Sequence, residues 1–564
     1  MTEKKTAPSF QFMKDESTSV LGGEWVPMYC TDEPVEFSKG DFETAMLNVI
    51  REPNINSTAI LRADILAEKF YDLEGNEQEL STDDKPVLSE SLPYDADAKL
   101  VNIDDITTRK ELIENKELEL TIVKEFVRRM IPRNPYKDAL INQTCLVYNS
   151  KKTENKDTSL VLYIPHFEDE ADCPFYIPHV QKVAILLHGG ILSVHYIPYA
   201  GQSEDLRKDN ERVVRTAFRL LQTAYKHSKG VMQGYEKRVN HDQVVDRVLF
   251  QDTYIQLKKK YSKFLVDNWA ESTDPKKHVF EDLAIAAFLL EFWKTQYGDD
   301  YKTTMQFRDM GCGNGVLTYI LISEGVNGVG IDARKRKSWS IYPTEIQRHL
   351  KEQVIIPSIL LRPTPDVRRY MPYLEDNGAM FPIKVEDGLI APATLVYSSA
   401  DLIASPNVNI CEFPDNTFII GNHSDELTCW IPLLGFPFMV IPCCSHDLSG
   451  KKVRFNTRVP KSEKTTPAMK NNIKINSNNV NNSNSTYAGL VNHVEYLAKK
   501  VGWKVEKEML RIPSTRNAAI IGTDNAYAKE FPTPDIYRTI EEEGGALTWV
   551  QNTMQLAKAS PRNH

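Results

Sequence analysis

Two short stretches constrain the fold of this chain more than any others. Residues 306–315 are QFRDMGCGNG, and residues 328–337 are GVGIDARKRK. An apolar segment that runs into alternating glycines and then into VLTYILISEG predicts a strand, a tight turn and a helix whose N-terminus faces a ligand. Glycines suit such a turn because a Cβ atom would block the approach of the ligand to the backbone. We therefore expect an α/β fold with a mostly parallel sheet and a ligand at its carboxyl edge.

The glycine spacing distinguishes between two kinds of nucleotide site. Residues 309–315 have the order D-x-G-x-G-x-G, whereas a dinucleotide fingerprint requires a glycine where this chain has Val316 or Thr318. The order instead resembles the first motif of class I methyltransferases, which have a Rossmann-like sheet and bind S-adenosylmethionine. The resemblance implies that Asp309 helps to hold the methionine end of the cofactor and that Asp332 binds the ribose hydroxyls. The cofactor-binding residues expected on this basis are Asp309, Gly311, Cys312, Gly313, Asn314, Gly315 and Asp332.

Cations follow several of the predicted strands and should lie at the same edge of the sheet. Those that come directly after Asp332 are Arg334, Lys335, Arg336 and Lys337. A basic rim suits a polyanionic substrate such as nucleic acid. A solvated turn, or an arginine for the 2′-phosphate of NADP, is the alternative explanation. Later cations that we also expect to contact RNA are Lys451, Lys452, Arg454, Arg511 and Arg516.

Longer stretches resemble one particular family of class I methyltransferases. Together with the glycine loop, they resemble the tRNA (uracil-44 2′-O) methyltransferase family over about residues 205–525. The stretches are TYIQLKKKYSKFLVDNWAESTDPKKHVFEDLAIAAFLLEFW, FIIGNHSDELTCWIPLL, FMVIPCCSHDLSGKK and RIPSTRN. The resemblance implies transfer of a methyl group from S-adenosylmethionine to a uridine ribose 2′-oxygen, with tRNA as the partner, notably serine tRNA in fungi. No protein partner is evident from the sequence, and we expect no metal.

Two loops that follow later apolar strands carry candidate catalytic groups. A ribose 2′-hydroxyl must lose its proton to become a good nucleophile, so a base or an oriented acceptor is needed. In FIIGNHSDELT, His423 offers a base and Asp425 an orienting carboxylate, although a histidine that caps the next helix is an equal alternative. In FMVIPCCSHDLSGKK, His446 and Asp447 are candidates for positioning RNA or for the base.

The adjacent cysteines of the second loop leave two further functions open. Cys443 after Pro442 resembles the covalent nucleophile of pyrimidine C5 methyltransferases, although buried inert thiols are the simpler explanation. We expect no metal here, because adjacent cysteines chelate with strained geometry and no second ligand pair is evident. A rival from another class is a catalytically idle RNA-binding scaffold, against which the intact glycines and Asp332 count.

Composition limits the location and the kind of protein. Eight cysteines occur without any C-x-x-C pair, which favours a reducing compartment, and the start MTEKKTAPSFQF has no secretory signal. The most apolar stretch, WIPLLGFPFMVIP, is too short to span a bilayer. We therefore expect a cytoplasmic protein with no membrane association. A net charge of -9 excludes a chain that is basic as a whole, so any RNA must bind to local clusters of cations.

At 564 residues the chain should contain several domains. Two further local predictions are a helix that begins near Glu281 and Asp282, with both acids in its first turn, and a third sheet strand in VYSSADLIASPN around Asp401. The expected parts are an acidic, partly flexible region (1–135), a β-rich accessory segment (136–204), a helical segment (205–300), a Rossmann-like methyltransferase domain (301–530) with a disordered Asn/Ser-rich insertion (461–486), and a C-terminal tail or helix (531–564).

Overall fold

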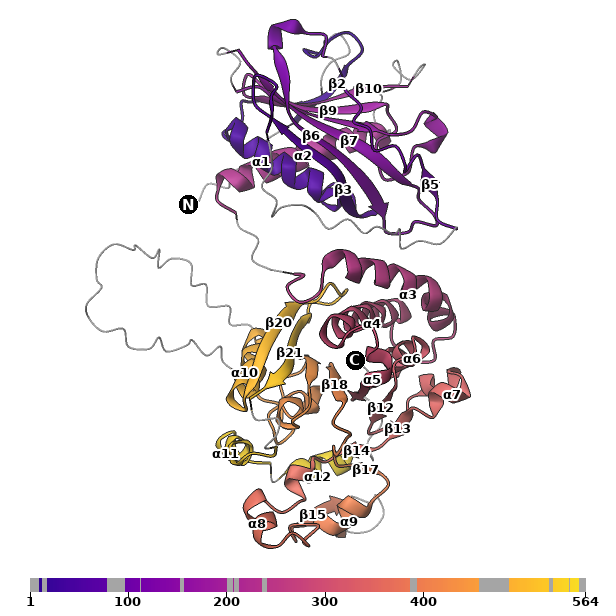
Figure 1. Cartoon of the computed structure of the whole chain (residues 1–564), viewed down its shortest axis with the longest axis vertical. Coiled ribbons are helices and arrows are strands. Elements are labelled where there is room, and N and C mark those ends of the chain that lie inside the picture. The colour runs from indigo at the N-terminus through magenta and orange to yellow at the C-terminus, as the bar shows by residue number, and fades with distance from the viewer. Residues whose placement is uncertain are drawn as a thin grey trace, which may run out of the picture. The chain divides into compact units, whose positions relative to one another are not determined.

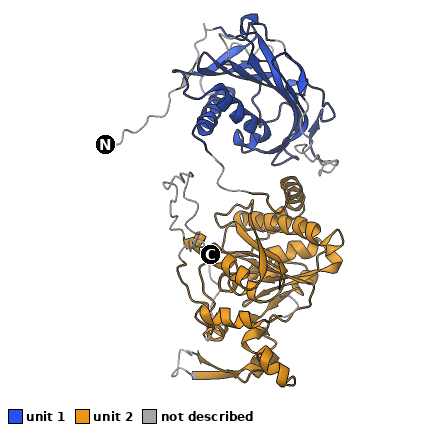
Figure 2. Cartoon of the chain, turned by 60° about the vertical axis from the view of Figure 1, so that its left-hand side comes forward, with its two compact units in different colours: residues 1–237 blue, residues 238–564 orange. Residues whose placement is uncertain are grey.

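The chain forms two compact units, Met1–Lys237 and Arg238–His564, in a computed structural model (Figures 1 and 2). In the part of the chain that the structure describes, no helix is long and apolar enough to cross a membrane. The described residues are 10–12, 18–78, 97–111, 113–152, 157–199, 206, 212–235, 241–385, 393–455, 486–526, 531–546 and 548–556.

Unit 1 is one large antiparallel sheet with two helices against it (Figure 1). The strand order is β1-β2-β10-β9-β8-β7-β6-β3-β4, and β5 pairs in parallel with β7. The elements are β1 (Phe10–Phe12), β2 (Val26–Thr31), α1 (Lys39–Arg51), β3 (Ile60–Tyr71), β4 (Glu77–Gln78), β5 (Leu100–Val101), β6 (Leu120–Pro132), β7 (Leu140–Ser150), β8 (Ser159–Pro165), β9 (Lys182–His188), β10 (Ile191–Ile197) and α2 (Arg212–Met232).

The central strands of the unit 1 sheet, such as β7 and β8, are buried on both faces. Side chains alternate along a strand, so Val161 of β8 packs in the cluster that holds both helices, whereas Leu160 packs in a cluster on the opposite face. Helix α2 contributes Val214, Ala217 and Leu221, which recur at helical spacing and form one apolar stripe. This stripe fixes α2 against the strands of unit 1.

The structure divides the N-terminal half differently from the segments expected above. Strands β2, β3 and β6 lie before residue 136 and belong to the same sheet as β7–β10, so no boundary falls at 135. Charged residues that are buried within strands, such as Arg62 and Arg128, hide the apolar signal of β3 and β6. The expected helical segment over 205–300 also divides, because α2 belongs to unit 1 and the later helices belong to unit 2. The acidic stretch 79–96 lies outside the described residues.

Unit 2 contains a seven-stranded sheet with the order β13-β12-β11-β18-β19-β21-β20. The first five strands are parallel, and β21 runs antiparallel to both of its neighbours. The strands and the longer helices are α3 (Arg247–Asp267), α4 (Pro275–Tyr297), β11 (Gln306–Met310), α6 (Val316–Ser323), β12 (Gly328–Asp332), β13 (Leu350–Glu352), β18 (Thr417–Asn422), β19 (Phe438–Ile441), α10 (Thr486–Lys500), β20 (Trp503–Met509) and β21 (Ala518–Asn525).

Helices cover both faces of this sheet, which gives three layers. Phe418 and Ile420 of β18 pack in the cluster that holds α4 and α6, and Ile419 between them packs in the cluster that holds α10. Burial on both faces explains why the consecutive residues Phe418–Ile420 of β18 are all apolar. The expected α/β fold with a mostly parallel sheet is therefore present in unit 2.

Shorter elements surround the main sheet of unit 2. Two small sheets pair β14 with β17 and β15 with β16. The elements are α5 (Tyr301–Thr304), α7 (Thr344–Gln347), β14 (Val354–Ile355), α8 (Pro365–Tyr370), β15 (Met380–Val385), β16 (Ala393–Ser398), α9 (Ser399–Ala404), β17 (Val408–Asn409), α11 (Pro534–Glu542) and α12 (Trp549–Leu556).

Two local predictions were wrong in unit 2. The strand beside β12 is β13, whereas the stretch around Asp401 forms β16 and α9 outside the main sheet. Helix α4 begins at Pro275, more than a turn before Glu281, because Asp274 caps its N-terminus. The acids of α4 therefore lie inside the helix. The Asn/Ser-rich insertion lies outside the described residues up to position 485, and α10 begins directly after it.

Candidate active site

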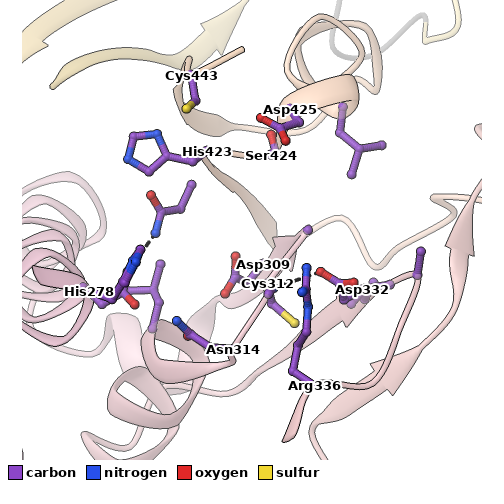
Figure 3. A pocket seen from close by; sticks show the side chains of 18 of the residues that line it. His278, Asp309, Cys312, Asn314, Asp332, Arg336, His423, Ser424, Asp425 and Cys443 are labelled. Carbon is purple, nitrogen blue, oxygen red and sulfur yellow. Dashed lines mark hydrogen bonds between the residues drawn. The ribbon is translucent and has the colours of Figure 1, made fainter. Parts of the chain in front are cut away.

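A pocket of about 460 Å³ lies at the carboxyl ends of the parallel strands of unit 2. The turns after β11, β12, β18 and β19 all contribute to its wall, as expected for a ligand site in an open α/β sheet. Figure 3 shows His423, Asp425 and Cys443 on one side, with Asp309, Cys312 and Asp332 across the pocket from them.

The glycine loop is shaped for close approach of a ligand. Gly311, Gly313 and Gly315 all have positive φ angles, which other residues rarely adopt. A Cβ atom on Gly311 would lie 3.4 Å from Cβ of Ser424, and one on Gly315 would lie 3.1 Å from the Leu350 side chain. A Cβ atom on Gly313 would meet no atom within 4 Å, so the space beside this lining residue is free for a ligand.

The two acids expected to hold the cofactor both line the pocket. The Asp332 carboxylate accepts hydrogen bonds from the backbone N–H groups of Gly313, at 2.9 Å, and Arg334, at 3.0 Å. Asp309 is buried, and its Oδ2 accepts a 2.9 Å hydrogen bond from the Thr318 hydroxyl, while its Oδ1 has no hydrogen-bond partner. Burial raises the pKa of Asp309 to about 7, because the charged form is poorly solvated.

Helix α4 places two further acids, Glu281 and Asp282, at the pocket. We assigned neither of them a role in the site from the sequence. Oε1 of Glu281 lies 3.0 Å from Nε2 of His423, and Oδ1 of Asp282 accepts a 2.9 Å hydrogen bond from the Asn422 amide. Burial, together with the charges of Glu281 and Asp309, raises the pKa of Asp282 well above its ordinary value. Two adjacent acids directly before the apolar run LAIAAFLL are the sequence signal that marks them, since acids are rarely buried unless they are paired.

The expected catalytic residues divide into two groups. His423 and Asp425 line the pocket, and both have left-handed backbone angles, with φ of 51° and 43°. Burial lowers the pKa of His423, but its interactions with Cys443 and Glu281 outweigh burial and raise the pKa to about 9. Burial raises the pKa of the Cys443 thiol, and the interaction with His423 outweighs this and lowers it.

His446 and Asp447 do not line the pocket. His446 is buried, with its Nε2 3.8 Å from Glu426, and Oδ1 of Asp447 accepts hydrogen bonds from the backbone N–H groups of Ser449 and Lys451. Asp447 therefore stabilises the turn after β19. The structure does not bring this pair to the place where we expected it.

The expected RNA-binding cations differ in whether they line the pocket. Arg334, Arg336 and Arg516 line the pocket, whereas the other cations lie outside its wall. Arg511 forms a two-point ion pair with Asp242, in which Nε–Oδ1 and Nη2–Oδ2 are 2.7 and 2.5 Å apart. Its guanidinium group is therefore directed at another part of unit 2. The exposed cations outside the pocket wall are Lys335, Lys337, Lys451, Lys452 and Arg454.

Family models match both units. Residues 3–238 match the model "TRM44-like, N-terminal bet v1-like domain", and residues 244–357 match the model "Predicted AdoMet-dependent methyltransferase". The fold and the pocket of unit 2 together with this second match define a methyltransferase that uses S-adenosylmethionine.

Curated relatives are similar to the chain over nearly its full length. A tRNA (uracil-O(2)-)-methyltransferase of Saccharomyces cerevisiae is 62% identical over 98% of this chain and 96% of its own length. The proteins of that name from Kluyveromyces lactis and Schizosaccharomyces pombe are 62% and 35% identical, over 97% and 93% of this chain and 98% and 91% of their own lengths. The chain belongs to the tRNA (uracil-O(2)-)-methyltransferase family.

Proposed function

We propose that this chain transfers a methyl group from S-adenosylmethionine to the ribose 2′-oxygen of a uridine in tRNA. The observation that carries the proposal is a single pocket in which the glycine loop and Asp332 face His423 and Asp425, with arginines at the rim. Relatives that carry the name tRNA (uracil-O(2)-)-methyltransferase support the acceptor. We further propose that the main sheet of unit 2 is the Rossmann-like class I methyltransferase sheet, which its strand order and antiparallel β21 support.

The cofactor fits the groups that the pocket offers. When bound, S-adenosylmethionine supplies an already activated methyl group on a sulfonium centre. Asp309 has a buried carboxylate oxygen without a hydrogen-bond partner, so Asp309 and the nearby Asp282 are suited to the ammonium group of the methionine end. Asp332 is held by backbone N–H groups and is suited to the ribose hydroxyls. The free space beside Gly313 lets the cofactor lie against the backbone.

The opposite wall of the pocket is suited to the acceptor. With a pKa raised to about 9, His423 carries a proton at neutral pH and acts as a hydrogen-bond donor that positions the RNA. The carboxylate that orients the His423 ring is that of Glu281, whereas the sequence suggested Asp425. Asp425 is then the candidate that accepts a hydrogen bond from the 2′-hydroxyl. Alignment of this hydroxyl with the methyl group accounts for a large part of such catalysis.

The substrate around the acceptor nucleotide is tRNA in this proposal. Arg334, Arg336 and Arg516 lie where phosphates next to the acceptor would pass, and the exposed lysines after β12 and β19 extend this cationic track. By resemblance the nucleotide is uridine 44 of serine tRNA. A cytoplasmic location follows from the same proposal and from the cysteine pattern.

Labelled methyl transfer to total tRNA, followed by nucleoside digestion and mass spectrometry, tests the function. Wild type should form 2′-O-methyluridine, and Asp332→Ala should form none. A 5-methylpyrimidine that disappears in Cys443→Ala would instead assign the chemistry to that thiol, whose lowered pKa and place in the pocket favour it as the second candidate. Cofactor binding without any methylated nucleoside would support the idle scaffold.

A further inference from the structure

One group of side chains in the described residues has the spacing of a metal site. Potential ligand atoms of Asp425, Cys443 and Cys444 all lie within 4.8 Å of one another. Cys443 and Asp425 line the pocket, and the three residues come from the turns after β18 and β19, which are neighbours in the sheet. All eight cysteines are free, so neither thiol is consumed by a disulfide.

The separation of the two thiols matches a tetrahedral ion. Two thiolates at the usual Zn–S distance of about 2.3 Å lie about 3.8 Å apart in a tetrahedral site. The sulfur atoms of Cys443 and Cys444 are 4.0 Å apart. Adjacent cysteines rarely direct both sulfurs to one point, which is why the sequence alone argued against a metal. In the structure, the turn after β19 holds the two sulfur atoms at the separation that a tetrahedral ion requires, so this argument no longer applies.

We propose that Cys443, Cys444 and Asp425 bind one zinc ion, with water in the fourth position, as in zinc sites that have three protein ligands. Two thiolates and one carboxylate suit a divalent ion of intermediate softness better than magnesium or calcium. The ion ties the turn after β18 to the turn after β19 and places a cation on the wall that faces the glycine loop. One Asp425 oxygen serves as ligand, and the other stays directed to the acceptor. The site is independent of the identity of the methyl acceptor.

Metal content of the purified full-length chain tests the proposal. After reduction, incubation with zinc and dialysis, elemental analysis should find one zinc per chain. Cys443→Ser and Cys444→Ser should each weaken zinc binding at least about 10-fold, since each removes one of three protein ligands. Cys30→Ser is the matched control, because Cys30 is also a free, half-buried cysteine but lies in unit 1, and it should leave zinc binding unchanged. Zinc retained by the Cys443→Ser, Cys444→Ser double variant overturns the site.

Cobalt substitution gives a readout that requires no variant to fold. Wild type loaded with Co²⁺ should show a thiolate-to-cobalt charge-transfer band and the intense visible bands of a tetrahedral site. Absence of the charge-transfer band overturns ligation by the cysteines. In Asp425→Ala the charge-transfer band should remain and the visible bands should shift, and unchanged visible bands overturn Asp425 as a ligand. These measurements use neither tRNA nor S-adenosylmethionine, so failure of the zinc site and failure of methyl transfer are separate results.

Discussion

The indole N–H of Trp339 donates a hydrogen bond to the backbone carbonyl of Gly313, at 2.9 Å. The Tyr342 hydroxyl donates to the carbonyl of Asn314, also at 2.9 Å. Two buried aromatic side chains from the segment after β12 therefore hold the glycine loop from behind. The shape of the loop depends on these contacts as well as on its own glycines.

Trp339→Phe should weaken cofactor binding while leaving the fold intact. It removes one hydrogen bond, worth about 1 kcal/mol, from the part of the loop that lines the pocket, so the Kd for S-adenosylhomocysteine should rise by about 5-fold. Isothermal titration calorimetry measures this. Trp503→Phe is the control, since its buried indole N–H donates a hydrogen bond to the Pro432 carbonyl, and neither residue lines the pocket. An unchanged Kd in Trp339→Phe would contradict the role of Trp339.

Asp332→Ala should nearly abolish cofactor binding. Two hydrogen bonds from ribose hydroxyls to a carboxylate are worth about 3 kcal/mol together, which corresponds to about 100-fold in Kd. Titration with S-adenosylhomocysteine measures the loss, and the exposed Asp415→Ala provides the control. If Asp332→Ala binds as tightly as wild type, the ribose must be held elsewhere.

Asp309→Asn should change how stability depends on pH. Burial raises the pKa of Asp309 from its ordinary value near 3.8 to about 7. Between these values the folded state binds more protons than the unfolded state, so wild-type stability should fall as pH rises through this window. Asp309→Asn is neutral at this position and lacks this loss. Its free energy of unfolding relative to that of wild type should therefore rise by up to about 4 kcal/mol between a pH below 4 and a pH above 7. Denaturant unfolding at both ends of the window measures the difference, and a constant difference would rule out the raised pKa.

Glu508→Ala should destabilise unit 2. Glu508 is buried in β20, and its carboxylate accepts hydrogen bonds from the backbone N–H groups of Asp242, Gln243 and Val244 at 2.9, 2.7 and 2.9 Å. Removing it leaves three N–H groups without an acceptor, and we expect a loss of about 3 kcal/mol in the free energy of unfolding. Glu506→Ala, exposed on the same strand, should change stability little. Equal effects of the two substitutions would contradict this role.

Arg511→Ala should affect stability and Arg516→Ala should affect tRNA binding, so each variant serves as the control for the other. Arg511 is paired with Asp242, so its loss should lower the free energy of unfolding by about 1 kcal/mol and leave tRNA affinity unchanged. Arg516 is exposed at the pocket wall, so its loss should weaken tRNA binding and reduce the salt slope of the binding constant by about 1. Filter binding at several salt concentrations measures the slope. A smaller slope in Arg511→Ala would show that its ion pair opens to receive RNA.

Local sequence patterns predicted the part of the site that comes from consecutive residues. The run from Asp309 to Gly315 was correctly placed as the end of a strand, a turn and the start of a helix, because hydrophobic runs and glycine spacing report backbone geometry within a few residues. Asp332 was placed at the end of the next strand on the same grounds. The expectation that the cations directly after it reach the pocket holds for Arg334 and Arg336 only.

The long-range partners of those residues were decided by packing in three dimensions. The carboxylate behind His423 is Glu281, 142 positions earlier, and Glu508 binds backbone N–H groups more than 260 positions before it. No pattern within either segment encodes such a pairing, because it depends on which face of α4 or β20 meets the sheet. The same holds for Asp425 after β18, which lies close to the two thiols after β19. Spacing along the chain predicted the residue types of the site, and burial of the helices against the sheet determined which of them meet.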